Sequence, residues 1–202
     1  MEYHNSVLLR DSIDALAIKE DGVYVDITFG GGGHSREILS RLGEKGKLVA
    51  FDQDPDAKRN KIEDNRFVLI EENFRYISRF LKFYGIKKVD GILADLGVSS
   101  HQFDEGKRGF SIRFNGDLDM RMNRHSLLSA KEVVNKYSEE DLANVLYNYG
   151  ELTNSRMIAA EIVRSRENHP ITTTNELIAC VSHLVPEKKK NQFLARLFQA
   201  IR

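Results

Sequence analysis

The chain has 202 residues, 41% of them hydrophobic, which is enough to bury a core and fits one domain or one domain with a sizeable insertion. Lysine plus arginine and aspartate plus glutamate each number 30, so the net charge is zero and any polyanion must be bound by local patches. The single cysteine, Cys180, excludes an intramolecular disulfide framework and offers no metal cluster, and it fits a reducing, cytoplasmic setting. Because no apolar run approaches the roughly 18 residues of a membrane span, we expect a soluble protein.

The first half of the chain alternates between strand-like and helix-like patterns. The expected strands are 24–28, 47–52, 66–70 and 89–95, and the expected helices are 35–42, a polar one after residue 52, and 76–85. Such alternation predicts an α/β fold in which a parallel sheet has helices on both faces. Ligands of such sheets bind at the carboxyl ends of the strands.

The second half has a different character, because a loop rich in Gly, Ser, Arg and Asp runs from Asp95 to about Ser126 and only helical patterns follow. We expect no further strand there. Apolar stripes at helical spacing occur in 156–166 and 192–201. The pattern therefore predicts that this half is a helical subdomain.

Two residue pairs, one a capping box and one that resembles it, predict helix starts in this half. Ser138 with Asp141 precedes one apolar stripe, and Thr173 with Glu176 precedes another. Gly150 is placed to follow the end of the first of these helices, where glycine is common.

A glycine-rich loop follows the first predicted strand directly, as Phe29 and then Gly30 to Gly33, and Ser35 can cap the helix that comes next. Glycines let a backbone take left-handed conformations and approach a ligand closely, at about 0.5–1 kcal/mol each relative to alanine. A flexible turn is the plain alternative. The flanking strand and helix favour a nucleotide site.

The spacing of the loop distinguishes between kinds of nucleotide. A dinucleotide fingerprint would need a third glycine at Ser35, so a hydride-transferring enzyme is disfavoured but stays open as the second interpretation. The pattern Asp26, Thr28, Gly30, Gly32 resembles a methyltransferase loop in which Thr28 replaces the first glycine. Asp26 would then lie near the methionine end of the cofactor.

Asp52 ends the next predicted strand, about 20 residues after the loop, where a carboxylate can accept hydrogen bonds from ribose hydroxyls. Its alternative role is that of an exposed acid in the turn before Pro55. Together the loop and Asp52 predict a nucleoside-containing ligand.

Several short motifs, in order and spacing, resemble the ribosomal RNA small-subunit methyltransferase H family, whose members make N4-methylcytidine. Each motif alone is weak, but together they cover nearly the whole chain. They are His4 to Leu9, Thr28 to Ser35, Asp90 to Gln102, Arg108 to Ser111, Leu118 to Met122, Tyr149 to Glu151 and Phe198 to Arg202.

The resemblance implies a class I Rossmann-like methyltransferase core, a partial parallel sheet in this chain, with an inserted helical subdomain. We expect residues 1–104 to form the N-terminal part of the core and 105–202 the helical substrate-recognition insertion. It also implies S-adenosylmethionine as cofactor, with Phe74 flanking the adenine unless that ring is simple core packing. The implied cofactor contacts are Gly32, Gly33, His34, Asp52, Phe74, Asp95 and Gln102.

The resemblance further implies that family members continue beyond Phe198 to Arg202 with a glycine-rich turn and another strand. We therefore expect this chain to be truncated relative to them. Strand 92–94 would form a sheet edge able to pair with another chain, which leaves a homodimer open. Cofactor binding is expected to survive, whereas catalysis by this chain is in question.

For methyl transfer to a cytidine amine, Asp95 is the residue that we expect to be catalytic. The reaction is an in-line displacement that needs no metal, so the protein mainly positions the reactants. The amine's lone pair is delocalised into the ring, and an acceptor on its N–H groups would localise it. Asp95 stands at the carboxyl end of the last predicted strand, although it could also simply cap that strand. Ser99, Ser100 and Gln102 follow on the same loop.

The expected partner is small-subunit ribosomal RNA or a ribosomal particle, with an unpaired base drawn into a pocket and cations holding phosphates. Asp117, Asp119 and Arg121 could instead pair with one another, and the Lys188 to Lys190 run could be only solvated. Binding of RNA without catalysis is a further interpretation. The candidate RNA contacts are Lys107, Arg108, Arg113, Arg121 and Arg124, interleaved with Phe103, Phe110 and Phe114, and extended by Arg164, Arg166 and Lys188 to Lys190.

Overall fold

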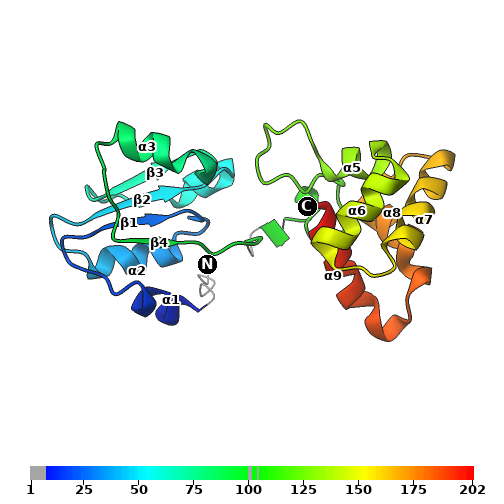
Figure 1. Ribbon diagram of the computed structural model, residues 1–202, viewed down its shortest axis with the longest axis horizontal. Coiled ribbons are helices and arrows are strands. Elements are labelled where there is room, and N and C mark those ends of the chain that lie inside the picture. The colour runs from blue at the N-terminus through cyan, green and yellow to red at the C-terminus, as the bar shows by residue number, and fades with distance from the viewer. Residues whose placement is uncertain (1–7, 100–101, 104) are drawn as a thin grey trace. The chain divides into compact units, whose positions relative to one another are not determined.

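The computed structural model describes residues 8–99, 102–103 and 105–202, and the chain divides into two compact units (Figure 1). The first unit contains the described residues up to Ser99 together with 122–124. The second contains the remaining described residues up to Arg202. Each unit is described by itself below.

A parallel four-stranded sheet forms the centre of the first unit, in the order β3-β2-β1-β4. Its strands are β1 (Val23–Asp26), β2 (Lys47–Phe51), β3 (Phe67–Ile70) and β4 (Gly91–Leu93). Val25 pairs with Val49 on one side and with Ile92 on the other. The α/β fold class is confirmed, and the strands are shorter than the sequence pattern indicates because pairing stops where the chain turns into loops.

Helices cover both faces of this sheet (Figure 1). On one face, α1 (Leu9–Ala15) and α2 (Gly33–Arg41) bury Ile13 and Ile38 against alternate strand residues such as Leu48. On the other face, α3 (Ile77–Phe83) packs on the intervening strand residues. The apolar alternation along the strands thus builds two core layers.

Two local expectations for the first unit need correction, and one helix, α1, was not predicted. The polar helix expected after residue 52 is the 3₁₀ helix η1 (Pro55–Asn60). A second 3₁₀ turn, η2 (Phe74–Tyr76), leads into α3. Ser35 does not cap α2, because the left-handed turn at Gly32 starts the helix earlier, at Gly33.

The second unit is helical, and its described residues hold one isolated bridge, Asp117 to Thr173, but no strand. Its core is formed mainly where α6 packs against α7 and α9. Figure 1 shows these helices side by side. The elements are η3 (Gly106–Arg108), α5 (Ala130–Lys136), α6 (Glu139–Gly150), α7 (Ser155–Asn168), α8 (Thr174–Val181), η4 (Ser182–Leu184), η5 (Glu187–Lys189) and α9 (Lys190–Ile201).

Both predicted helix starts in this unit are confirmed. The Ser138 hydroxyl accepts a hydrogen bond from the N–H of Asp141 at 3.0 Å, and Thr173 forms a complete capping box with Glu176. Such caps satisfy backbone N–H groups that the helix itself leaves unpaired.

The predicted role of Gly150 is wrong. Gly150 is the last residue of α6, and the left-handed residue after it is Glu151, with a φ of 52°. A Cβ on Gly150 would lie 2.9 Å from the Cβ of Ala200 and 2.9 Å from the carbonyl oxygen of Arg196. The glycine is therefore needed for the close approach of α9, not for the helix end.

Among the described residues, no helix is both long and apolar enough to cross a membrane.

Within the described sheet, β4 pairs with β1 alone. The expectation that strand 92–94 lies at a sheet edge is thus confirmed for this part of the chain.

Candidate cofactor site

The residues that the sequence singles out in the first unit gather where the parallel strands end, which we call the carboxyl edge. Asp26 ends β1, Asp52 follows β2, Phe74 follows β3 and Asp95 follows β4. Parallel strands bring these four chain segments to one edge of the sheet, although they are distant in sequence.

Asp26 organises the start of the glycine loop. It is fully buried, and its Oδ2 accepts a hydrogen bond from the Ser35 hydroxyl at 2.7 Å. Its Oδ1 accepts hydrogen bonds from the N–H of Thr28 at 3.0 Å and from the Thr28 hydroxyl at 3.4 Å. Burial raises the pKa of the Asp26 carboxyl, and these hydrogen bonds oppose the shift. The carboxylate is thus engaged by groups of the protein itself.

The loop after β1 turns through two left-handed glycines, Gly30 with a φ of +49° and Gly32 with a φ of +76°. A Cβ at Gly32 would lie 2.7 Å from Arg36 Nη1, whereas one at Gly31 would meet nothing within 4 Å. Gly33 and His34 form the first turn of α2, where backbone N–H groups have no partner within the helix. A side chain at Gly32 would therefore collide with Arg36, whereas the space next to Gly31 is open.

Two side chains from outside the loop hold its carbonyl groups. Asn60 Nδ2 donates to the carbonyl oxygen of Gly30 at 3.0 Å, and Arg36 Nη1 donates to that of Gly31 at 2.7 Å. Arg36 also donates to the carbonyl of Asn60 at 3.1 Å. Neither residue was predicted, because neither belongs to a recognisable motif.

Asp52 holds the loop from the neighbouring strand. Its Oδ2 accepts a hydrogen bond from the N–H of Gly30 at 2.7 Å, and its Oδ1 accepts one from the N–H of Asp54 at 2.8 Å. Burial raises the pKa of Asp52, with smaller contributions in the same direction from the charges of Asp54 and Asp26. Asp52 is half-buried, and a carboxylate has about four acceptor positions, so further donors can bind.

Phe74 lies at the first position of η2 with 37% of its surface exposed. The preceding residue, Asn73, donates to the Oε1 of Gln53 at 2.8 Å, and Gln53 directly follows Asp52. This hydrogen bond ties the turn that carries Phe74 to the end of β2. With this exposure Phe74 is not one of the buried core residues, and its contact with an adenine stays a prediction.

Asp95 has an exposed side chain, and its backbone N–H donates to the Thr28 hydroxyl at 2.8 Å. Thr28 thus joins the ends of β1 and β4 while it also contacts Asp26. From the sequence, Thr28 was predicted only as the residue that replaces the first glycine of a methyltransferase loop. The signal that could have identified Thr28 is its hydroxyl, which stands directly after a predicted strand and can form a hydrogen bond with the end of a neighbouring strand.

The remaining predicted cofactor contact, Gln102, belongs to the second unit and is buried there. Ser99 belongs to the first unit and is half-buried. Ser100, also expected on that loop, and part of the N-terminal motif that begins at His4 lie outside the described residues.

The predicted RNA contacts differ in whether their side chains are exposed to a ligand. Arg108 is buried and donates to the carbonyl oxygen of Arg121 at 2.9 Å, so it supports the loop. Arg121 pairs with Asp119 at 2.7 Å, which confirms the structural role considered for that pair. Lys107 and Arg113 have exposed side chains, whereas Arg124, also exposed, pairs with Asp56 at 3.3 Å.

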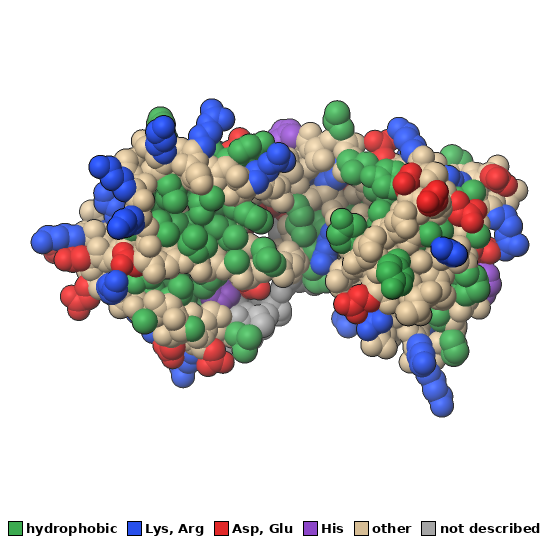
Figure 2. All heavy atoms as spheres, viewed as in Figure 1, with side chains coloured by type: hydrophobic (Ala, Val, Ile, Leu, Met, Phe, Trp, Pro, Cys, Tyr) green, Lys and Arg blue, Asp and Glu red, His purple; other side chains and the backbone are tan. Residues whose placement is uncertain are grey.

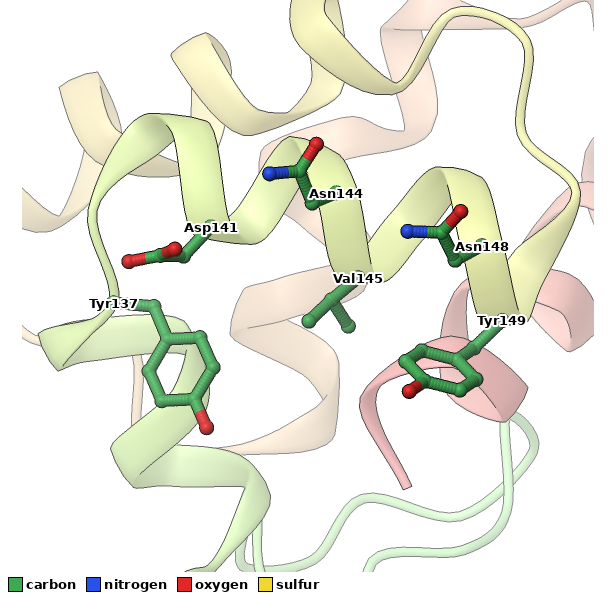
Figure 3. Close-up of a pocket in the computed structure, with 6 residues that line it drawn as sticks. All are labelled: Tyr137, Asp141, Asn144, Val145, Asn148 and Tyr149. Carbon is green, nitrogen blue, oxygen red and sulfur yellow. The ribbon is translucent and has the colours of Figure 1, made fainter.

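The second unit also has a surface pocket of about 460 Å³ along α6 (Figure 3). None of the predicted site residues lines it. Acidic residues fill the first turn of this helix, Glu139, Glu140 and Asp141, which makes the pocket a poor site for phosphate. The lining residues are Tyr137, Asp141, Asn144, Val145, Asn148 and Tyr149.

The parallel sheet and the glycine loop after β1 define a Rossmann-like methyltransferase fold. The model of the MraW methylase family matches residues 1–202, and the chain belongs to that family. This membership favours a methyltransferase over the oxidoreductase that the sequence left open.

Curated relatives include proteins named ribosomal RNA small subunit methyltransferase H. The one from Christiangramia forsetii is 59% identical over 202 residues, which cover 100% of this chain and 67% of the relative. The one from Flavobacterium johnsoniae is 60% identical with the same coverage, and the one from Bacteroides thetaiotaomicron is 53% identical over 100% of this chain and 66% of its own length. The chain thus spans about two thirds of the length of these relatives.

Proposed function

We propose that this chain carries the cofactor site of an S-adenosylmethionine-dependent enzyme that methylates the N4 amino group of a cytidine in small-subunit ribosomal RNA. The main support is the carboxyl edge, where the glycine loop, Asp52 and Asp95 follow neighbouring strands and are joined by hydrogen bonds. The names of the relatives support ribosomal RNA as the substrate.

The residues present at the carboxyl edge fit such a cofactor. Asp52 is half-buried and keeps acceptor capacity for ribose hydroxyls, and Phe74 offers a partly exposed ring for the adenine. Gly31 leaves open space beside the loop, and the implied contacts Gly33 and His34 begin α2 directly after it. We assign Gly32 to shaping the loop, since a side chain there would collide with Arg36.

The bound cofactor would supply a methyl group on a sulfonium, and the protein would position the two reactants. We assign to Asp95 a hydrogen bond from the target amine, which would localise the lone pair of that nitrogen. The backbone of Asp95 is held by Thr28, so its carboxylate would be oriented before substrate arrives. Gln102 is proposed to form a hydrogen bond with the cofactor or the base, and the helical unit is proposed to contribute to substrate recognition.

Cofactor choice is tested by calorimetry with S-adenosylmethionine and with NAD on the same preparation of the chain. Binding of S-adenosylmethionine is expected, and binding of NAD alone would contradict the proposal. This measurement does not depend on whether the chain turns over.

The chemistry is tested by methyl transfer to undermodified small subunits, comparing this chain with one of the full length of its relatives. In the longer enzyme, Asp95→Ala should lower turnover far more than Asp95→Asn, because the amide keeps one acceptor oxygen. Loss of a transition-state interaction lowers kcat, whereas loss of a cofactor contact mainly raises KM for the cofactor. Near-normal kcat for Asp95→Ala at saturating cofactor would reduce Asp95 to a binding residue.

A further inference from the structure

The segment 73–89, which contains η2 and α3, concentrates positive charge in a chain whose net charge is zero. It contains no aspartate or glutamate. We call its exposed cations and its most exposed ring the α3 surface: Arg75, Arg79, Lys82, Phe83, Lys87 and Lys88.

Helical spacing separates these cations from the core. Ile77, Phe80 and Leu81 point toward the sheet and pack on its apolar residues. Arg75, Arg79 and Lys82 are spaced by four and three residues, so they share the opposite face. Figure 2 shows Lys and Arg side chains along the border of the first unit where Figure 1 places α3.

No described acidic residue pairs with these cations. Elsewhere in the same unit, exposed cations do have partners, such as Lys58 with Glu71 at 2.9 Å and Arg41 with Asp14 at 2.6 Å. None of the cations of the α3 surface forms an ion pair with another described residue. Their charge is therefore available to an external anion.

Exposed aromatic rings lie among these cations. Phe83 is 81% exposed and meets Tyr84 edge-on, with ring centroids 5.2 Å apart. The Arg75 guanidinium lies 5.0 Å from the centre of the Tyr76 ring. Unpaired bases stack on such rings while cations hold the phosphates, and this combination distinguishes single strands from duplexes.

We propose that the α3 surface binds single-stranded RNA, with its cations on phosphates and Phe83 under a base. This inference rests on the proposed function, and it adds the path that the substrate RNA strand follows along the protein. Arg75 directly follows Phe74, the proposed adenine neighbour, so the α3 surface begins at the carboxyl edge. A strand held there would be led toward the cofactor site.

The test is binding of a labelled oligouridine to the chain over a salt series from about 50 to about 200 mM, with duplex RNA of equal length for comparison. The variant R79E/K82E is matched by K45E/K47E, which makes the same charge change at exposed lysines where β2 begins, opposite the carboxyl edge. Circular dichroism of both variants is the control that checks that they are folded.

R79E/K82E should weaken oligouridine binding by roughly tenfold or more and flatten the salt slope by about 0.7 per lost phosphate contact. Phe83→Ala should weaken it roughly tenfold with an unchanged salt slope, because stacking is not ionic. K45E/K47E should have a much smaller effect. Equal losses in the two charge variants, or equal binding of duplex and single strand, would overturn the proposal.

Calorimetry with S-adenosylmethionine separates this proposal from the proposed function. All the variants should bind the cofactor as the unaltered chain does, since none of these side chains is assigned to its site. If the unaltered chain binds no S-adenosylmethionine but R79E/K82E still loses oligouridine selectively, the proposed function fails while the α3 surface stands as an RNA site.

Discussion

The Asp52 carboxylate accepts a hydrogen bond from the backbone N–H of Gly30 at 2.7 Å, so the end of β2 holds the loop that follows β1. The same carboxylate accepts the N–H of Asp54 and starts the next turn. Asp52 therefore supports the loop before any ligand binds, in addition to its proposed contact with ribose. Binding and stability measurements must be combined to separate these two roles.

Replacing Asp52 with alanine should weaken S-adenosylmethionine binding by about 1–3 kcal/mol, because ribose hydroxyls lose a partly buried acceptor. It should also lower the free energy of unfolding of the unliganded chain by about 1–2 kcal/mol, because the backbone N–H groups of Gly30 and Asp54 lose their hydrogen-bond acceptor. Calorimetry and urea unfolding measure the two effects. Glu44→Ala, an exposed acid of the same unit, is the control for charge loss. Unchanged cofactor affinity in Asp52→Ala would leave Asp52 with the structural role alone.

Thr28→Val should loosen the start of the Asp95 loop, since the lost hydroxyl accepts the Asp95 N–H and donates to Asp26. We expect a loss of about 1–2 kcal/mol in the free energy of unfolding. Hydrogen exchange of the Asp95 amide should also become faster. Thr28→Ser keeps the hydroxyl and should preserve slow exchange. Equally fast exchange in both variants would show that the hydroxyl does not hold this loop.

Gly150→Ala should destabilise the helical unit although alanine favours helices. The gain in helix propensity is about 1 kcal/mol, but the new Cβ would press on Ala200 and Arg196, and such overpacking typically costs about 1–3 kcal/mol. The neighbouring Glu151→Gly should instead be neutral or stabilising by up to about 1 kcal/mol, because it relieves a left-handed residue. Urea unfolding of both variants decides between these signs, and a more stable Gly150→Ala would contradict the packing argument.

The pair of Asp64 and Arg66 should give stability that depends on acid pH. Hydrogen bonds from Arg66 lower the pKa of Asp64 from 3.8 to about 2. A lowered pKa in the folded state means that the stabilisation is present above about pH 4 and is lost as the pH falls toward 2. Asp64→Asn should therefore reduce the free energy of unfolding at pH 7 by less than about 1 kcal/mol, as is usual for a surface pair. The difference from the unaltered chain should shrink between pH 4 and pH 2 in urea unfolding, whereas a constant difference would contradict this origin. Glu44→Gln serves as the control.

Much of the fold was predictable because its signals are local. Alternating apolar residues predicted the parallel strands, and the residue pairs Ser138 with Asp141 and Thr173 with Glu176 predicted two helix starts. Each of these signals depends on side chains within a few positions of one another. The carboxyl-edge position of Asp52 was predictable for the same reason, since it directly follows a strand.

Three of the errors concern residues whose partner lies outside the local sequence pattern. Gly150 has the sequence context of a helix end, but its neighbour in space is Ala200 on α9. Ser35 has the context of a helix cap, but its hydroxyl donates to Asp26 across the start of the loop. Arg108 looked like a phosphate contact, but it is buried and holds the carbonyl of Arg121.

The sequence by itself determined the order of the four strands, the glycine loop and the acids placed at strand ends, because backbone propensity and apolar periodicity act over short distances. Only the tertiary structure decided which of these groups meet. The parallel pairing of β2, β1 and β4 brings Asp52 to Gly30 and Asp95 to Thr28, and η1 brings Asn60 to the loop. Hydrogen bonds act over about 3 Å, so they form between strand ends that the sheet has already brought together.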